Sequence, residues 1–341
     1  MKTFIYGAGK YGELLLRYMR DISVQVNYFV QTEEPDIKEI DGVPVISYKE
    51  MIQLEGRKNV YIAIKNIKIA KEIEENIRIA KNSDIKVYQY GGFINDNPFM
   101  FLNATQSNGL QYCIVCKNKP NKFLPSGTKA EIFKKHHIIG GGYRENNICP
   151  CCGVDDRMRW FYYLLQNKLN ILTASGRLLH FAPESAIYDY IKQNENIDYY
   201  TCDIVPGRAM HVVDITDIPF RENTFDYIIS NHIIEHIKDE EKAVSEIKRV
   251  LKPNGKWILS FPICTDMKTY ENDEIISPED KLEAYGQEDH VRLYGFDYKE
   301  RFENYGFKIE VFSPEREINE EDISKYGFIK DDVVLIATKY M

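Results

Sequence analysis

Apolar positions in the first 95 residues alternate between two patterns. Short apolar runs predict buried strands at 3–6, 24–30, 43–46, 60–64 and 86–90. Apolar positions at helical spacing predict helices at 48–54 and 67–80, and a further helix that begins after residue 9. Strands that alternate with helices form a parallel sheet covered on both faces, so this segment predicts a small Rossmann-like unit.

The same alternation returns in residues 161–341. Strands are predicted at 177–181, 197–204, 225–230, 257–261, 307–312 and 333–338, and a short helix at 188–193. The segment 239–251 predicts an amphipathic helix with one apolar face, made of Ala243, Val244, Ile247, Val250 and Leu251. After it, Asn254-Gly255 predicts a turn into the next strand.

Residues 96–160 lack this periodicity and are rich in Asn, Pro, Gly and Lys. A loop-rich segment of this length needs something other than an apolar core to order it. We therefore expect an α/β protein with two Rossmann-like doubly wound domains, at 1–95 and 161–341. A zinc-binding, loop-rich connector at 96–160 is expected to join them.

Cysteine spacing supports that connector. Cys113 and Cys116 form one C-x-x-C knuckle, and Cys149 and Cys152 form the second after 32 intervening residues. Two knuckles can offer four thiolates to zinc, and four protein ligands leave no open position, so this zinc would be structural. The spacing leaves open a ligand role for Cys151, a redox C-x-x-C and free buried thiols.

Composition narrows the classes of partner. The chain has 341 residues, a net charge of −8 and 44% hydrophobic residues, which is typical of an ordinary globular protein. Its acidic balance argues against nucleic acid as a partner. We find no run of eighteen apolar residues and no signal peptide, so we expect a cytoplasmic protein without membrane contact. Homo-oligomer formation stays open.

Gly7, Gly9 and Gly12 match G-x-G-x-x-G between the first predicted strand and helix. Such glycines let backbone N–H groups approach a phosphate, which predicts a nucleotide site. The acid that dinucleotide sites carry near the end of the second strand is absent or displaced, since the chain reads Val30-Gln31-Thr32-Glu33. We therefore favour a nucleotide or nucleotide sugar over NAD. The alternative is that the glycines serve only a tight turn.

The stretch 214–262 places an acid at a strand end, then a strand, an amphipathic helix and another strand. This order resembles the second half of a class I S-adenosylmethionine (SAM)-dependent methyltransferase. The segments at 140–146, 156–159, 178–184 and 286–295 resemble a bacterial group of such enzymes, of methyltransferase type 11, with a cysteine-rich front end. The resemblance implies SAM as the cofactor. Because members often lie among genes for surface-glycan assembly, it also implies a small polar acceptor such as a sugar, nucleotide sugar or glycan precursor.

The resemblance also points to the SAM site. Its first loop is Phe181-Ala182-Pro183-Glu184, which lacks the glycines usual in class I enzymes. A carboxylate can accept both ribose hydroxyls, and we assign this role to Asp203. Further contacts are expected from Asp214 and Ile215 at the adenine and from Asn231 near the methyl group. Solvated strand-end charges, or a loop that has lost SAM binding, remain alternatives.

Methyl transfer needs an aligned acceptor and, for a hydroxyl or ammonium acceptor, a base. We expect His290 or His232 to be the base, with Asp289 orienting His290. For the acceptor we expect Arg292 to bind an acidic group, Tyr294 (with Tyr270) to stack on a sugar ring, and Glu235 to line the floor. Structural roles for these side chains remain open. Competing functions are a nicotinamide- or nucleotide-sugar-binding oxidoreductase and a binding protein with a decayed SAM site.

Overall fold

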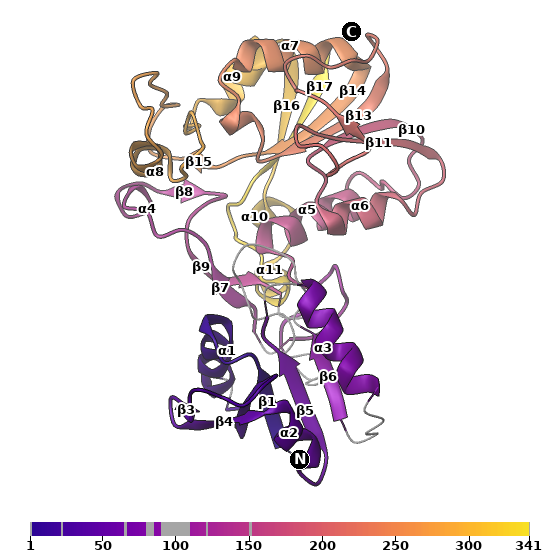
Figure 1. The fold of residues 1–341 in the computed structure, drawn as a ribbon. Helices are drawn as coiled ribbons and strands as arrows, with labels where there is room; N and C mark the ends of the chain where they lie inside the picture. The colour runs from indigo at the N-terminus through magenta and orange to yellow at the C-terminus, as the bar shows by residue number, and fades with distance from the viewer. Residues whose placement is uncertain are drawn as a thin grey trace. The chain divides into compact units, whose positions relative to one another are not determined.

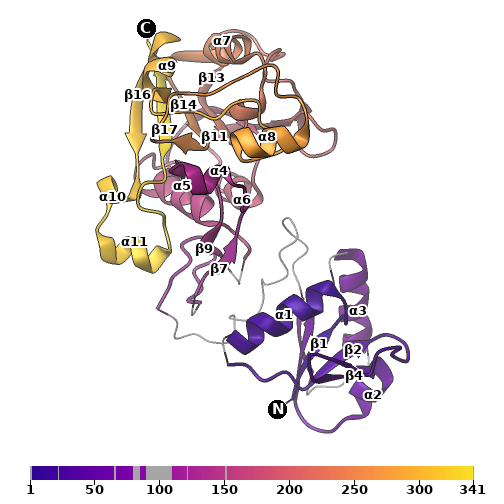
Figure 2. The same cartoon turned by 90° about the vertical axis from the view of Figure 1, so that its left-hand side faces the viewer.

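The computed structural model describes residues 2–21, 23–64, 67–79, 85–89, 110–120, 122–149 and 152–340. The chain forms two compact units (Figures 1 and 2). The N-terminal unit comprises Met1–Leu124 and Ile148–Gly153, and the C-terminal unit comprises Pro125–Asn147 and Val154–Met341. Residues 125–147 group with the C-terminal unit, and the four cysteines of the two knuckles group with the N-terminal one.

The N-terminal unit contains a six-stranded sheet in the order β3-β4-β2-β1-β5-β6. All neighbouring strands are parallel except β3, which is antiparallel to β4. The strands are β1 (Lys2–Tyr6), β2 (Tyr28–Gln31), β3 (Glu39–Ile40), β4 (Val43–Ser47), β5 (Lys58–Ile62) and β6 (Ile85–Gln89). Chain order reverses between β1 and β5, so the predicted doubly wound arrangement is confirmed.

Helices cover both faces of this sheet, as the alternating pattern predicted. Helix α1 (Lys10–Asp21) packs Leu15, Leu16 and Met19 on one face. Helices α2 (Tyr48–Gln53) and α3 (Ile67–Ile79) pack Met51, Ile73 and Ile77 on the other. Apolar side chains of both faces are thereby removed from water, which is the main stabilising contribution to such a layered fold.

The glycine motif lies at the carboxyl end of β1 and enters α1. Gly7 has a φ of +117°, which glycine tolerates best, and its N–H donates to the Val30 carbonyl at 2.9 Å. A Cβ on Gly12 would lie 1.9 Å from the Gly7 carbonyl oxygen, whereas one on Gly9 would meet no heavy atom within 4 Å. Gly12 therefore serves close packing, and the space beside Gly9 is open.

We expect Gly12→Ala to destabilise the N-terminal unit by roughly 1–3 kcal/mol, because the backbone must shift to admit the methyl group. Gly9→Ala is the matched control and should melt like the parent protein, because its methyl group has room. Thermal unfolding of the three proteins by circular dichroism checks this. Equal melting of the two variants would contradict the steric explanation of Gly12.

The C-terminal unit contains a seven-stranded sheet in the order β12-β11-β10-β13-β14-β17-β16. The first five strands are parallel, and β17 and β16 are antiparallel to their neighbours. The strands are β10 (Gly176–Phe181), β11 (Ile197–Asp203), β12 (His211–Val212), β13 (Phe225–Asn231), β14 (Leu251–Ser260), β16 (Phe307–Phe312) and β17 (Val334–Lys339). This second predicted Rossmann-like fold is also confirmed.

Helices α7 (Glu240–Val250) and α9 (Tyr298–Asn304) lie on one side of this sheet, and α5 (Asp156–Asn167) and α6 (Ser185–Ile191) on the other (Figures 1 and 2). Helix α7 begins where the Asp239 side chain accepts the Lys242 N–H and buries the predicted apolar face. Helix α5 was not predicted. Its buried aromatic residues, including Trp160 and Phe161, obscure the helical period in the sequence.

The predicted turn at Asn254-Gly255 lies inside β14, which begins at Leu251, and does not precede the strand. Phe225 pairs with Leu251, and the next pair is Tyr227 with Lys256, so extra residues loop out of β14 between the two pairs. Asn254 takes a φ of +62° there. An irregularity of this kind lets a strand keep its ladder on both sides, which a turn would end.

Smaller elements complete the described part of the chain. Two-stranded sheets pair β7 (Leu124–Ser126) with β9 (Arg144–Ile148) and β15 (Ile263–Cys264) with β8 (Ile138–Ile139). The remaining helices are α4 (Ile132–Lys135), the 3-10 helix η1 (Ile234–His236), α8 (Pro278–Tyr285), α10 (Pro314–Glu317) and α11 (Glu320–Tyr326). Among the described residues, none of the helices has the length and apolar character that a membrane span requires.

Candidate functional site

The carboxyl ends of β10, β11 and β13 meet at the edge of the C-terminal sheet where chain order reverses. The chain runs from β10 outward to β11 and β12, and then returns to the other side of β10 with β13. Ligands of open α/β sheets bind at such a switch point, outside the carboxyl ends of the strands. The predicted SAM residues follow these strand ends.

The loop after β10 brings a carboxylate to the switch point. Ala182 has a φ of +45° and donates its N–H to the Cys202 carbonyl at 2.7 Å, so the loop turns sharply. Glu184 is the N-cap of α6. One of its carboxylate oxygens lies 3.0 Å from His180 Nε2, and the other accepts the Asn231 side-chain amide at 3.3 Å. Of the predicted residues, Glu184 and Asn231 are therefore brought together.

Two further predicted acids lie at the end of β11 and just after β12. Asp203 ends β11, and its Oδ1 accepts the Val205 N–H at 2.8 Å. Asp214 Oδ1 accepts both the N–H and the hydroxyl of Thr216 at 2.8 Å. Ile215 is buried in the core. Ile204, the apolar residue directly after Asp203, is 65% exposed. It was not among the predicted site residues, although its position beside a predicted ribose contact was a signal.

The segment after β13 holds the predicted histidine His232 in a left-handed conformation. Its φ is +51°, and its N–H donates to the Ser260 carbonyl at 2.8 Å. Its ring lies 3.1 Å from Glu235 Oε1 and 3.1 Å from Arg157 Nη1. Burial, and then the charge of Arg157, hold the pKa of His232 well below its usual value. Arg157 was not among the predicted site residues and lies in the family-like segment 156–159.

Glu235, His236 and His290 form a tight cluster beside His232. The rings of His236 and His290 meet edge to face with 4.6 Å between centroids, and Asp289 lies 3.2 Å from His236 Nδ1. Asp289 thus contacts His236, whereas we predicted that it orients His290. Burial raises the pKa of Glu235 to about 8 and lowers the pKa of His290 to about 4.

Arg292 and Tyr294, predicted to contact the acceptor, have partners inside the C-terminal unit. Arg292 is buried, pairs with Glu271 at 2.9 Å and donates to the carbonyls of residues 234, 237 and 238. Tyr294 is buried and donates its hydroxyl to Glu240. These contacts favour structural roles for both side chains.

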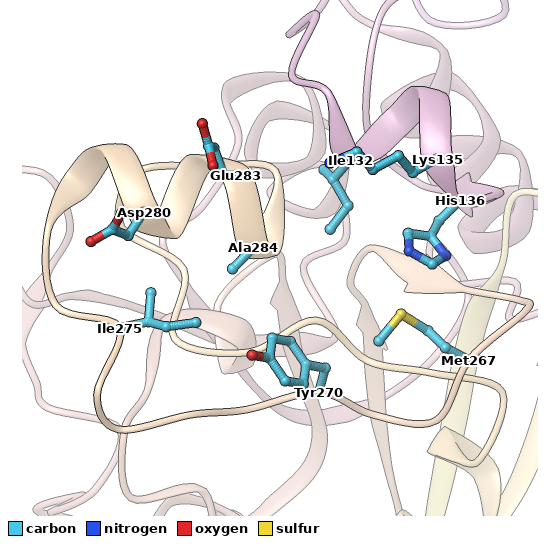
Figure 3. A pocket seen from close by; sticks show the side chains of 9 residues that line it. All are labelled: Ile132, Lys135, His136, Met267, Tyr270, Ile275, Asp280, Glu283 and Ala284. Atoms are coloured by element: carbon cyan, nitrogen blue, oxygen red, sulfur yellow. The ribbon is translucent and has the colours of Figure 1, made fainter.

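A cavity of about 440 Å³ lies in the same unit between α4 and α8 (Figure 3). Its wall combines apolar and charged side chains: Ile132, Lys135, His136, Met267, Tyr270, Ile275, Asp280, Glu283 and Ala284. His136 Nδ1 also lies 3.0 Å from Asp266. The size is that of a small-molecule pocket, and Tyr270 lies in its wall.

The buried carboxyl group of Asp332 is expected to make the stability of the protein depend on pH. Burial, and then the charge of Asp156, raise the pKa of Asp332 to about 7. Between about pH 4 and pH 7 the folded protein thus keeps a proton that the unfolded chain has released, so stability falls as the pH rises through this window. We expect Asp332→Asn to remove this fall, worth roughly 1–3 kcal/mol, in denaturant unfolding at pH 5 and pH 8. The control, Asp331→Asn, alters a more exposed acid and should keep it.

The four cysteines of the two knuckles converge in the N-terminal unit, as predicted. Sγ of Cys113 lies 3.7 Å from that of Cys152, and Sγ of Cys116 lies 3.8 Å from that of Cys149. All four sulfurs lie within 4.8 Å of one another. Four thiolates about 2.3 Å from a tetrahedral zinc would be about 3.8 Å apart, so the arrangement fits this ion. Cys151 lies outside the described residues.

Comparison with known proteins gives consistent findings for the C-terminal unit. Residues 183–259 match a family model described as methyltransferase domain. An uncharacterized methyltransferase of Schizosaccharomyces pombe is 32% identical over 76 residues, which are 21% of this chain and 27% of that protein. The 2-phytyl-1,4-naphtoquinone methyltransferase of Trichormus variabilis is 25% identical over 166 residues, 46% of this chain and 67% of that protein.

Among solved structures, the YcgJ protein of Bacillus subtilis has 14% identity and a TM-score of 0.32, and the match covers 51% of this chain and 97% of that one. The matched residues of this chain span about a quarter of the length of the Schizosaccharomyces pombe protein and about two thirds of that of the Trichormus variabilis enzyme. The residues matched by the family model, 183–259, lie in the C-terminal unit and include Glu184, Asp203, Asp214 and Asn231.

Proposed function

We propose that this chain, whose C-terminal unit is a class I SAM-dependent methyltransferase domain, transfers a methyl group from SAM to a small polar acceptor. The observation that carries the proposal is the set of polar side chains at the switch point of the parallel sheet. Asp203 and Asn231 end β11 and β13, and Glu184 follows β10, the strand between them. A family model for methyltransferases matches the same part of the chain.

The residues present fit SAM. The carboxylate of Asp203 can accept the two ribose hydroxyls, and the exposed Ile204 beside it offers an apolar surface for adenine, with Asp214 and Ile215 nearby in sequence. Ala182 is small enough for the loop backbone to approach the methionine portion. A loop without glycines is therefore compatible with SAM binding, since SAM carries no phosphate that a glycine-rich loop would need to bind.

Bound SAM supplies an electrophilic methyl group, and the protein must align the acceptor and take its proton. His232 is our first candidate for this base. It follows Asn231 at the end of β13, and contacts with Glu235 and Arg157 hold its ring. His290 and Asp289 lie in the adjoining cluster. The base role is tested by His232→Asn, which should lower kcat far more than it changes SAM affinity.

For the acceptor we propose a sugar, nucleotide sugar or glycan precursor, bound in the cavity of Figure 3. Tyr270 offers a ring face for a sugar, and Lys135 offers a charge for a phosphate or carboxylate. The cavity borders the segment 263–267, which follows β14 by two residues. This acceptor class rests mainly on the resemblance described above, and a screen of nucleotide sugars tests it.

For the N-terminal unit we propose a structural zinc on the four cysteines and a nucleotide or nucleotide sugar at Gly7, Gly9 and Gly12. The sulfur spacing supports the zinc. The open space beside Gly9 supports a ligand at the glycine turn. Strand β2 ends at Gln31, so the acid typical of NAD sites is missing there, which disfavours a nicotinamide oxidoreductase.

The deciding experiment is calorimetric titration of the full chain with SAM and with its demethylated product. Micromolar binding of both supports the proposal and leads to the acceptor screen. Binding of neither would favour a decayed SAM site, and the same instrument would then titrate NAD and nucleotide sugars against the N-terminal unit's glycine motif.

A further inference from the structure

We propose that Glu235, His236 and His290 bind a divalent transition-metal ion, at a site separate from the four cysteines. Each residue offers one ligand atom, and these atoms lie within 4.8 Å of one another. Two imidazoles and one carboxylate are a common ligand set for zinc and for iron(II), and they leave coordination positions open. The cluster lies in the C-terminal unit: Glu235 and His236 belong to η1, which follows β13, and His290 follows α8.

Two atoms of this cluster are buried and, among the described residues, have no hydrogen-bond partner. They are Oε2 of Glu235 and Nδ1 of His290, on side chains of residues only 1% and 4% exposed. Buried polar atoms in native proteins almost always have a partner, because losing water without replacement costs free energy. A cation between these residues would satisfy both atoms at once.

Neighbouring side chains contact Glu235 and His236 and hold them in place, as hydrogen-bonding neighbours do for the ligands of known metal sites. His232 Nδ1 lies 3.1 Å from Glu235 Oε1, so the other oxygen of this carboxylate is the one left for a ligand role. Asp289 lies 3.2 Å from His236 Nδ1, and a carboxylate on one ring nitrogen is the usual partner of a metal-binding histidine.

An ion can reach this site from solvent. The His236 side chain is 26% exposed and that of Asp289 67%. Asp289 also lines an open hollow of about 560 Å³ together with Thr128 and Gln287. Three protein ligands would leave room for an oxygen of a bound molecule, and a metal ion makes a bound hydroxyl easier to deprotonate. This last role rests on the proposed methyl transfer, whereas metal binding does not.

The test uses the full chain loaded with one equivalent of zinc, which the four thiolates bind in preference to a two-histidine site, and freed of excess zinc by dialysis; Co²⁺ is the probe. We expect calorimetry to show one Co²⁺ bound per chain, with weak visible d–d absorption and no thiolate charge-transfer band. Glu235→Gln, which preserves the side-chain shape, and His236→Gln, at a partly exposed position, should each weaken Co²⁺ binding at least tenfold. The control Asp266→Asn, in the separate group His136, Cys264 and Asp266, should bind Co²⁺ like the parent protein.

Circular dichroism and unchanged zinc content identify variants that remain folded. The proposal is overturned if the parent protein binds no Co²⁺, if the cobalt spectrum shows only thiolate ligation, or if both folded variants bind Co²⁺ as tightly as the parent. SAM titration of the same samples separates this outcome from failure of the methyltransferase proposal, because SAM binding without Co²⁺ binding removes only the metal site.

Discussion

Cys113→Ser is expected to abolish zinc binding at the four cysteines and to unfold the segment that contains them. Cys113 is fully buried, and its sulfur lies 3.7 Å from that of Cys152. Among the described residues, the local core contains little else than the cysteines, Phe123 and Val115. Structural zinc contributes about 10–16 kcal/mol of apparent binding free energy in small zinc domains, so its loss exceeds what this small core can replace.

Two measurements check this prediction. The cobalt-substituted parent protein should show a thiolate charge-transfer band that Cys113→Ser lacks, and limited proteolysis should cut the variant within 110–153 first. Cys264→Ser is the matched control, because Cys264 is also buried but lies outside the four-cysteine cluster, where its thiol donates a hydrogen bond to Asp266. A folded Cys113→Ser protein with the full cobalt–thiolate band would refute the zinc assignment.

Asp203→Ala is expected to reduce SAM affinity at least about 100-fold. A carboxylate that accepts two ribose hydroxyls makes two charge-assisted hydrogen bonds, each worth about 1.5–3 kcal/mol. Asp203 ends β11 at the switch point, and its Oδ1 already accepts the Val205 N–H, which holds the carboxylate in place. Calorimetric titration with SAM measures the loss directly.

Asp198→Ala provides the control on the same strand. Asp198 is half-exposed and pairs with Arg177 at 3.2 Å, away from the carboxyl end of β11. This variant should bind SAM like the parent, and both variants should keep their zinc, because the cysteines lie in the other unit. Unchanged SAM affinity in Asp203→Ala would remove this residue from the cofactor site.

The sequence by itself determined both sheets and the cysteine cluster. Apolar runs at strand spacing and amphipathic helices reflect local burial, which repeats along the chain and can be read without the fold. The predicted segments 43–46, 197–204 and 225–230 correspond to β4, β11 and β13 within about a residue or two. Each cysteine knuckle was equally predictable, because a C-x-x-C turn places its two thiols together by local geometry; the two knuckles meet through tertiary packing, which the shared metal-ligand chemistry of four cysteines made expected.

Only the tertiary structure decided which distant side chains meet. Arg157 contacts His232, and His290 contacts His236, although each pair is far apart in sequence; these contacts depend on how α5, the segment after β13 and the segment after α8 pack together. The same packing gave Arg292 and Tyr294 internal partners, although their residue types suited ligand binding equally well. Residue type and spacing report local geometry and burial, whereas a site between elements depends on long-range packing that no local pattern encodes.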